Sequence, residues 1–479
     1  MSTEPGIGRD EWVARSEERR QRKGFFGPGA DAFMRLPWWV RWGMFVLLVA
    51  VVPLIFPSGY VRRVAFDTLL YMLLALGLNV VVGWGGLLDL GYVAFYGFGA
   101  YMYAWLDSSQ FDVHLPSLLS ILVVVVSTAI LGLLVGLPSR RLSGDYLAIV
   151  TLFFLQAFLV LVINGNSLLG INFTNGSNGI AALDPLHLFG HNLPVAHGGI
   201  FNVWYMYVAL AFFVVVLVAL RFVNDSRTGR AWRALREDPL AAELMSMPVN
   251  RLKLMAFMFG AATAGLTGAL FASLNAGVFP ANFFLPLLIT IYAMVILGGA
   301  GSQAGVVLGA ILVNVLLEVL RSPQHSRWVF YVVVLAALLA FVRPWKWLAV
   351  VLLGTLAFGF AVRVSVHAID PSWTGGVTQG SDSVGRAIGH WVAIPTTLGS
   401  GKAIAYVALI AMVLALTTLK GTTRWLFMIP TLYMGAFVWE NVLAEKPEVT
   451  RFILLGALLV GVMTTRPQGI LGTSRVEIV

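Results

Sequence analysis

Apolar runs close to the length of a membrane span recur along the whole chain, and they constrain its fold more than any other feature. Two of them read "MFVLLVAVVPLIF" (44–56) and "WYMYVALAFFVVVLVAL" (204–220). A helix crosses a bilayer core of about 30 Å with about 20 apolar residues. The chain is 58% hydrophobic with a mean hydropathy of +0.84, which leaves too little polar surface for a soluble protein.

The fold class predicted from these runs is all-α, a polytopic transmembrane helical bundle of about 12–14 spans. A transmembrane barrel is unfavourable because its strands would alternate apolar and polar residues. Several segments are short enough to be partial or re-entrant spans. The candidate spans are 38–56, 64–83, 86–106, 117–137, 146–163, 201–220, 252–273, 284–298, 305–321, 327–342, 346–362, 402–419, 424–440 and 451–465.

Lys and Arg are distributed unevenly between the two sides of these spans. With the N-terminus inside and alternating spans, the inner segments hold 22 of these residues and the outer segments hold 9. Cytoplasmic loops of membrane proteins carry such an excess. The distribution therefore predicts that both termini are cytoplasmic, with residues 1–37 as a cytoplasmic tail. That tail does not resemble a cleavable signal peptide, since it has no short apolar core before a small-residue cleavage site.

The charge and the composition narrow the possible functions. Basic inner loops account for the net charge of +9, so we predict no nucleic-acid partner. The chain has no cysteine, which excludes disulfides and thiolate metal sites, and its scattered histidines predict no metal site. The segment nearest to a phosphate-binding loop, "TLGSGKA" (397–403), fails because Thr396 and Ala403 replace the required Gly and Ser or Thr. We predict no catalytic residues and no cofactor bound by this chain.

Polar groups are rare inside the predicted spans, and one of them lies in a glycine-rich stretch. Asp89 is part of "GWGGLLDLGYVAFYGFGAY" (83–101), and Asp67 and Asn79 precede it. Intramembrane polar groups are costly and tend to be functional. Glycines allow close packing of backbones or a break in a helix, where free backbone groups would meet a zwitterionic substrate. The alternative is that these glycines serve helix packing alone.

A second glycine cluster, "ILGGAGSQAGVVLGA" (296–310), ends one span and begins the next. We predict a tight turn between two spans here, followed by a GxxxG contact at Gly305 and Gly309. The predicted turn residues are Gly298, Gly299, Gly301 and Ser302.

The stretch "RTGRAWRALREDPLAAELMSM" (227–247) is charged, although charged residues make up only 11% of the chain. Asp238 before Pro239 is typical of a helix N-terminus. The short helix that follows has a small-residue face around Ala241 and Ala242, which suits docking into a groove of another protein. Charged neighbours would then set the register. The alternative is an ordinary basic loop on the cytoplasmic side.

Six segments in the same order resemble the permease subunits of ABC importers, in the version found in branched-chain amino acid permeases. They are "GLNVVVGWGGLLDLGYVAFYGFGAY" (77–101), "LPSRRLSGDYLAIVTL" (137–152), "TNGSNGI" (174–180), "REDPLAAELMSMPVNRLKLMAF" (236–257), "VILGGAGSQAGVVLGAIL" (295–312) and "RPQGILG" (466–472).

This resemblance implies a transport subunit of the bacterial cytoplasmic (inner) membrane with no enzymatic activity of its own. The implied partners are cytoplasmic ATP-binding subunits that hold the ATP and Mg²⁺, a second permease subunit in a heterodimer, a periplasmic or lipid-anchored substrate-binding protein, and membrane lipid. The implied substrates are branched-chain aliphatic amino acids.

The resemblance also implies roles for individual residues. One set would couple transport to the ATPase, with Ser246 standing where the family usually has a glycine: Arg233, Arg236, Glu237, Asp238, Ala241, Ala242, Glu243 and Ser246. A second set would lie near the substrate pathway or its outer mouth: Asn79, Gly83, Gly86, Asp89, Gly91, Gly97, Thr174, Gly176, Asn178 and Gly179.

The family's last helix and its Arg-Pro ending occur twice, at Arg343 and at Arg466. This repetition predicts inserted helices at 343–450 with an outer loop at 363–401. The other predicted parts are a permease core at 38–342, a cytoplasmic coupling loop at 221–253 inside it, and a final helix with a cytoplasmic C-terminus at 451–479.

Three other functions stay open on the sequence. A permease for urea or short amides would belong to the same family. An ion-coupled secondary transporter or channel, or a membrane scaffold or enzyme whose chemistry lies in the extra helices, would have no need for a docking helix at 239–245.

Overall fold

The computed structural model describes residues 36–108, 110–139, 142, 144–167, 170–188, 191–193, 196–197, 200–275, 277–342, 345–378, 383–396, 399, 401–443 and 447–472. The predicted tail at 1–37 lies outside these ranges except for its last two residues, and so does Arg343.

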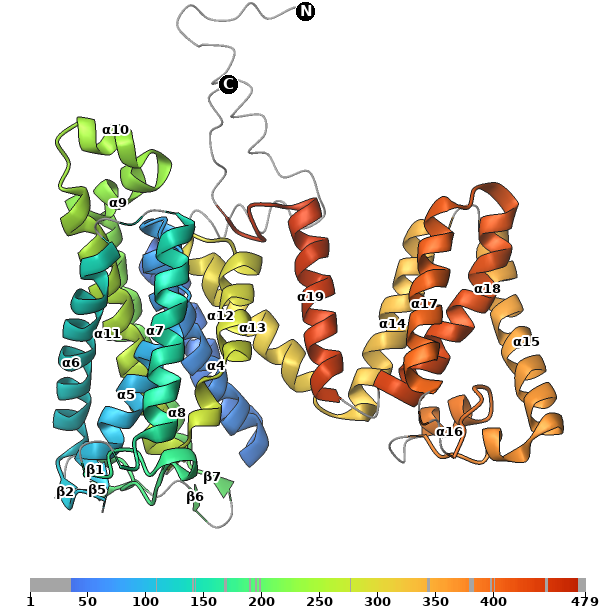
Figure 1. Ribbon diagram of the computed structural model, residues 1–479, viewed down its shortest axis with the longest axis horizontal. Helices are drawn as coiled ribbons and strands as arrows, with labels where there is room; N and C mark the ends of the chain where they lie inside the picture. Colours follow the sequence, from blue (N-terminus) through green and yellow to red (C-terminus); the bar gives the residue numbers. More distant parts are fainter. Residues whose placement is uncertain are drawn as a thin grey trace, which may run out of the picture.

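The protein is a bundle of long helices that run between two ends of the molecule (Figure 1). We call the end with α10 (Pro239–Leu244) the cytoplasmic end, following the predicted orientation, and the opposite end the outer end. The main bundle contains α3 (Trp38–Ile55), α4 (Gly59–Leu78) with the π-helix η1 (Asn79–Trp84), α5 (Tyr92–Leu106), α6 (Ser117–Ser139), α7 (Asp145–Asn164), α8 (Val203–Asp225), α11 (Val249–Asn275), α12 (Leu285–Gly298), α13 (Gln303–Val319) and α19 (Pro447–Thr465).

The all-α membrane fold is confirmed. Among the described residues, 10 helices are long and apolar enough to cross a membrane, or up to 11 if the bent pair α13 and α14 (Pro323–Phe341) is one span. Each predicted span contains a helix, and the shortest are α12, α5 and α13, with 14, 15 and 17 residues. The predicted span 86–106 starts too early, because residues 85–91 leave the helical path and α5 begins only at Tyr92.

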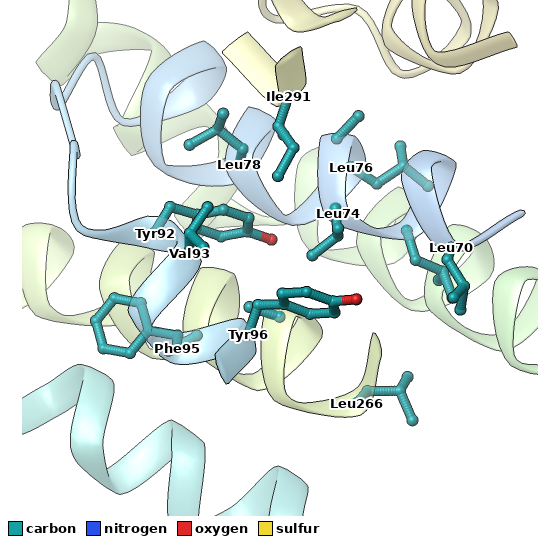
Figure 2. Close-up of a cluster of buried hydrophobic side chains, with 14 of the residues drawn as sticks. Leu70, Leu74, Leu76, Leu78, Tyr92, Val93, Phe95, Tyr96, Leu266 and Ile291 are labelled. Atoms are coloured by element: carbon teal, nitrogen blue, oxygen red, sulfur yellow. The ribbon is translucent and has the colours of Figure 1, made fainter. Parts of the chain in front are cut away.

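Helix α11 forms the centre of the main bundle and packs most closely on α5 and α6. Small residues make this possible: a Cβ added at Gly99 of α5 would meet Gly265 of α11 at 2.5 Å. Such small-residue contacts let membrane helices pack closely. Van der Waals packing stabilises their association, because the hydrophobic effect does not favour helix–helix over helix–lipid contact. On the other side of α5, Tyr92 and Tyr96 lie against Leu74 of α4 in a fully buried cluster (Figure 2).

Short strands and 3₁₀ turns close the outer end. The strand β3 (Ile180–Ala181) pairs antiparallel with β8 (Gly277–Val278), which joins the segment after α7 to the end of α11. The remaining outer elements are β1 (Asp107–Ser108), β2 (Val113–His114), η2 (Gly176–Asn178), β4 (His187–Leu188), β5 (His191–Asn192), β6 (Ala196–His197), β7 (Ile200–Phe201) and η3 (Pro280–Phe283).

Beside the main bundle stands a second group of helices, the accessory bundle (residues 323–443, Figure 1). It contains α14, α15 (Trp345–Ile369), η4 (Pro371–Thr374), α16 (Ser383–Gly389), α17 (Gly401–Thr418), α18 (Gly421–Val438) and the π-helix η5 (Trp439–Leu443). Its own apolar core joins Leu338 and Val342 to Leu348 and Val351.

The two helices that precede the Arg-Pro pairs pack in different places. Helix α14, which precedes the first Arg-Pro pair, packs on α15 and α18 of the accessory bundle. Helix α19, which precedes the second pair, packs instead on α12 and α13 of the main bundle, where Leu455 is buried in its core. The two helices have similar sequences, and the packing partners of each decide its place.

A buried ion pair fastens α14 to the end of α18. Arg327 Nε and Nη2 donate to the two carboxylate oxygens of Glu440 at 2.9 and 3.1 Å, and neither side chain is exposed. Phe330 stacks on Trp439 beside the pair, with ring centroids 4.1 Å apart. Breaking a buried pair by removing one charge costs about 3–5 kcal/mol, because the other charge is left without compensation.

We therefore predict that Glu440→Gln lowers the unfolding temperature of the detergent-purified protein, and that the double variant Arg327→Met/Glu440→Leu is less destabilised than Glu440→Gln. The matched control is Arg321→Gln, since the Arg321 side chain is 70% exposed and exposed pairs such as the one it forms with Glu318 contribute about 0–1 kcal/mol. Equal unfolding temperatures for Glu440→Gln and the unsubstituted protein would contradict the prediction.

Candidate coupling site

The charged stretch 227–247 forms two short helices, α9 (Arg227–Glu237) and α10, which project at the cytoplasmic end (Figure 1). The predicted start of α10 is confirmed: Asp238 is the N-cap, its carboxylate accepts from the N–H groups of Leu240 and Ala241 at 2.9 and 3.0 Å, and Pro239 is the first helical residue. An N-cap of this kind is worth about 1 kcal/mol.

The two faces of α10 differ in chemistry. Ala242 is buried with 4% exposure, whereas Leu240, Leu244 and Met245 are 67%, 78% and 76% exposed. Three large apolar side chains thus stand in solvent on a cytoplasmic projection, which marks an interaction surface. The predicted coupling residues Arg233, Glu237, Asp238, Ala241 and Glu243 are exposed around this tip.

Ser246 ends α10 in the left-handed conformation, with φ +62°. The N–H of Met247 donates to the carbonyl of Ala242 at 3.1 Å, and the N–H of Ser246 donates to that of Glu243 at 2.9 Å. This pair of bonds defines a Schellman motif, in which glycine is preferred at the position that Ser246 occupies. The turn is therefore preserved, although a serine replaces the glycine usual at this position in the family that the sequence resembles.

Helix α9 is held by a tryptophan that sequence reasoning did not select. Trp232 is fully buried, and its Nε1 donates to the carbonyl of Leu252 in the first turns of α11 at 2.9 Å. Its ring stacks on Trp84 of η1 with centroids 6.2 Å apart. A movement of α9 is thereby passed to both α11 and η1.

Arg236 points into the protein rather than toward the exposed tip. Its Nη1 donates to the carbonyl of Gly83 and, at 3.5 Å, to that of Ala300. Gly83 lies in η1, and Ala300 lies in the turn between α12 and α13. One guanidinium thus joins the coupling helices to two separate parts of the membrane bundle.

The helix α4–η1 breaks directly beyond this contact. Gly86 has φ +66°, which a residue with a Cβ rarely adopts, and a Cβ there would meet Arg236. Asn79 is fully buried, and its Oδ1 accepts from the N–H of Gly301 at 2.7 Å. Trp84 Nε1 donates to the carbonyl of Gly301 at 3.0 Å, so η1 is also bonded to the α12–α13 turn.

The predicted turn between two spans is confirmed. Gly299 and Gly301 have φ of +111° and +94°, and Ser302 is the N-cap of α13. The segment after α19 closes over this turn: the N–H groups of Ile470 and Leu471 donate to the carbonyls of Leu297 and Gly298. Each backbone comes close enough that a Cβ at Gly299 would meet Gly472.

We call this meeting point of α9, η1, the α12–α13 turn and residues 469–472 the cytoplasmic junction. It brings together two predicted groups, the coupling residue Arg236 and the pathway residues Asn79, Gly83 and Gly86, along with the turn residues.

Asp89 lies next to the junction, in the segment between η1 and α5. It is fully buried; its Oδ1 accepts from the N–H of Gly91 at 2.8 Å, and its carbonyl accepts from the Tyr292 hydroxyl at 2.6 Å. Gly91 and Gly97 serve close packing, since a Cβ at either would meet Thr151 or the ring of Phe158 at 2.5 Å.

The other predicted pathway residues lie at the opposite, outer end. Thr174 is buried and donates to the carbonyl of Val162 at 2.7 Å; Gly176 and Gly179 both adopt positive φ; Asn178 is exposed. They form the turn that leads into β3 and lie at the outer ends of α7 and α11.

A small cavity on the outer half of the main bundle was not predicted. It has a volume of about 150 Å³ and is lined by Asp67, Leu70, Tyr71, Leu74, Tyr96, Phe271, Asn282 and Leu287. Arg63 lies beside it and bonds both Asp67 and Asn275, at 3.1 and 2.8 Å. The sequence signal that could have identified this cavity is Asp67, a polar residue within an apolar span.

The fold and the cytoplasmic junction define a multi-pass membrane protein whose projecting helices are tied to a broken helix inside the bundle. Residues 60–342 match the family model described as branched-chain amino acid transport system / permease component. The chain belongs to this permease family.

Two relatives are high-affinity branched-chain amino acid transport system permease proteins LivM. The one from Salmonella typhimurium is 36% identical over 330 residues, and the one from Escherichia coli is 34% identical over 327; each alignment covers 64% of this chain and 74% of the relative. The permease protein LivH from Salmonella typhimurium is 32% identical over 114 residues, or 24% of this chain and 36% of LivH. No solved structure matches the chain.

Replacing Ser246 with Gly should stabilise the end of α10. A residue with a Cβ pays about 1–2 kcal/mol in the left-handed conformation, and glycine does not. We expect greater protection of the amides of Ser246 and Met247 from hydrogen exchange. Ser177, an exposed serine outside the left-handed region, is the control, and Ser177→Gly should give no such gain. Equal effects of the two substitutions would contradict the prediction.

Proposed function

We propose that this chain is the membrane-spanning permease subunit of an ABC importer that moves branched-chain aliphatic amino acids across the bacterial cytoplasmic membrane. The chain itself would catalyse no reaction, because partner subunits would hydrolyse the ATP. The observation that carries the proposal is the exposed apolar tip of α10 combined with the inward Arg236, which joins that tip to the broken helix α4–η1.

The proposed partners are two cytoplasmic ATP-binding subunits, a second permease subunit and a substrate-binding protein at the outer end. The solvent-exposed Leu240, Leu244 and Met245 support the first of these, since an apolar projection of this kind is stabilised by a groove on a partner. Likeness to both a LivM and a LivH permease protein supports the second.

The proposed mechanism is alternating access driven from α10. Closure of the ATP-binding subunits would displace α9 and α10 together, since Trp232 and Arg236 fasten α9 to the bundle. The movement would reach η1 through the carbonyl of Gly83 and the α12–α13 turn through that of Ala300. A ligand or partner shifts such an equilibrium by as much as it prefers one of the two states.

The cavity beside Asp67 is the proposed place of the substrate. Its carboxylate and the neighbouring Arg63 offer one charge of each sign, which suits the ammonium and carboxylate of an amino acid. Leu70, Leu74 and Leu287 form apolar walls that suit an aliphatic side chain. Urea and short amides have neither an ammonium nor a carboxylate group, so this lining favours the amino acid.

The docking part of the proposal predicts that Glu243→Arg weakens co-purification of the candidate ATP-binding subunits and lowers ATP-driven amino acid uptake in vesicles together. Reversal of one charge at a partner surface costs several kcal/mol when like charges face each other. The control is Asp145→Arg, another exposed acid at the cytoplasmic end, which should leave both measurements unchanged. If Glu243→Arg leaves both intact, the docking surface is wrong; if uptake needs only an ion gradient, the ABC importer assignment is wrong.

The transmission part predicts a different result for Arg236→Met. This variant keeps the exposed tip of α10 but removes the bonds to Gly83 and Ala300. We expect the ATP-binding subunits to stay bound and to hydrolyse ATP while amino acid uptake falls about tenfold or more, the loss expected when one or two charge-assisted bonds are removed. Arg233→Met, on the exposed side of the same helix, should affect binding at most. Normal uptake per ATP in Arg236→Met would contradict transmission through this side chain.

A further inference from the structure

Three buried hydrogen-bond donors at the cytoplasmic end have no partner among the described residues: Trp38 Nε1, Arg41 Nε and Gln303 Nε2. All three side chains line the same pocket. Gln303 is only 8% exposed, so water cannot reach its amide freely. An unpaired buried donor costs about 1–3 kcal/mol, which favours an acceptor bound in this pocket.

The pocket has a volume of about 460 Å³ and lies between α3, the end of α8 and the start of α13. Among the residues that the structure describes, two guanidinium groups line it, from Arg41 and Arg221, and no carboxylate does. Arg221 is oriented by Asp225 at 2.8 Å and lies over the ring of Trp38, 5.9 Å from its centroid. The positive charges and the unpaired donors together suit an anion.

The helix ends around the pocket favour an anion as well. Both α3 and α13 begin here, at Trp38 and at Gln303. The N-terminus of a helix carries the positive end of its dipole and free N–H groups.

The lower part of the pocket is apolar, with Phe45 from α3 and Val307, Leu308 and Ile311 from α13. These residues lie farther along their helices, toward the middle of the membrane, than the arginines and Gln303. Helix α3 stands at the edge of the bundle, where Leu47 and Leu48 are 65% and 64% exposed. The pocket thus continues from a polar end at the cytoplasmic surface to an apolar surface that lipid chains can reach.

From this arrangement we infer that the pocket binds the headgroup of an anionic phospholipid from the cytoplasmic leaflet. The phosphate accepts from Arg41, Gln303 and Trp38, and one acyl chain lies along Phe45 and Ile311. Basic pockets between helices on the cytoplasmic side are the sites in which membrane proteins take up such headgroups.

The site adjoins the cytoplasmic junction, because Gly301, Ser302 and Leu471 also line the pocket. Gly301 is the residue to which Asn79 and Trp84 bind. A bound lipid therefore contacts the α12–α13 turn, to which Arg236 also bonds. An effect of the bound lipid on transport would rest on the proposed function, whereas lipid binding itself does not.

The test is native mass spectrometry of the full-length chain, purified in detergent and incubated with phosphatidylglycerol or with phosphatidylcholine that carries the same acyl chains. We expect selective retention of phosphatidylglycerol. Arg41→Gln and Arg221→Gln should each lower its affinity about fivefold, which corresponds to about 1 kcal/mol per basic residue. Gln303→Glu, which places a negative charge in the pocket, should lower it further.

Arg227→Gln is the matched control, since Arg227 is exposed at the same end of the protein outside the pocket. It should leave the affinity for phosphatidylglycerol unchanged. Only variants that unfold at the same temperature as the unsubstituted protein are compared. Equal retention of the two lipids, or equal losses for Arg41→Gln and Arg227→Gln, would overturn the proposal.

A second arm separates a lipid from a free anion. Leu308→Trp fills the apolar part and leaves the arginines in place, so it should weaken binding of phosphatidylglycerol. Millimolar inorganic phosphate should not displace the lipid. If phosphate does displace it, and Leu308→Trp has no effect, then the pocket is a site for a free anion and the lipid proposal is wrong.

Discussion

The bond from the Arg236 guanidinium to the carbonyl of Gly83 is the interaction on which the cytoplasmic half of this permease depends. A helix that breaks inside a membrane leaves backbone groups without partners, and no water is present to satisfy them. Here the break follows Gly83, and a side chain from outside the membrane bundle meets its carbonyl. Asn79 and Trp84 bond the other side of the break to Gly301, so the cost of the broken helix is offset by contacts that also tie three elements together.

In the proposed mechanism this arrangement transmits a displacement of α9, because its members have little freedom to move separately. Trp232 is packed between Trp84 and α11, and the backbones at Gly299 and Gly472 are too close to admit a Cβ. Close-packed interfaces switch between discrete arrangements and do not deform continuously. A displacement of α9 would therefore favour a second arrangement of the whole junction. The outer turn at Thr174–Gly179 lies apart from this network, at the outer end of the main bundle.

Local chemistry made part of this site predictable, and tertiary packing decided the rest. Asp238 before Pro239 specifies a helix start from neighbouring residues alone, and the α12–α13 turn follows equally from its glycines. The direction of Arg236 could not be read in this way, because a helical pattern gives the face of a residue but not the partner that faces it. The sequences of α14 and α19 are similar, so sequence alone could not assign them to different bundles. Only their contacts place α19 on the main bundle.

The accessory bundle is tolerated because it respects the topology of the core. Between α13 and α19 it adds α14, α15, α17 and α18, an even number of long helices, so α19 runs from the outer to the cytoplasmic end as α14 does. The segment after α19 thereby reaches the cytoplasmic junction, where Ile470 and Leu471 bond to the end of α12. An odd number would have carried these residues to the outer end, and the turn at Gly298–Gly301 would have lost the backbone groups that cover it.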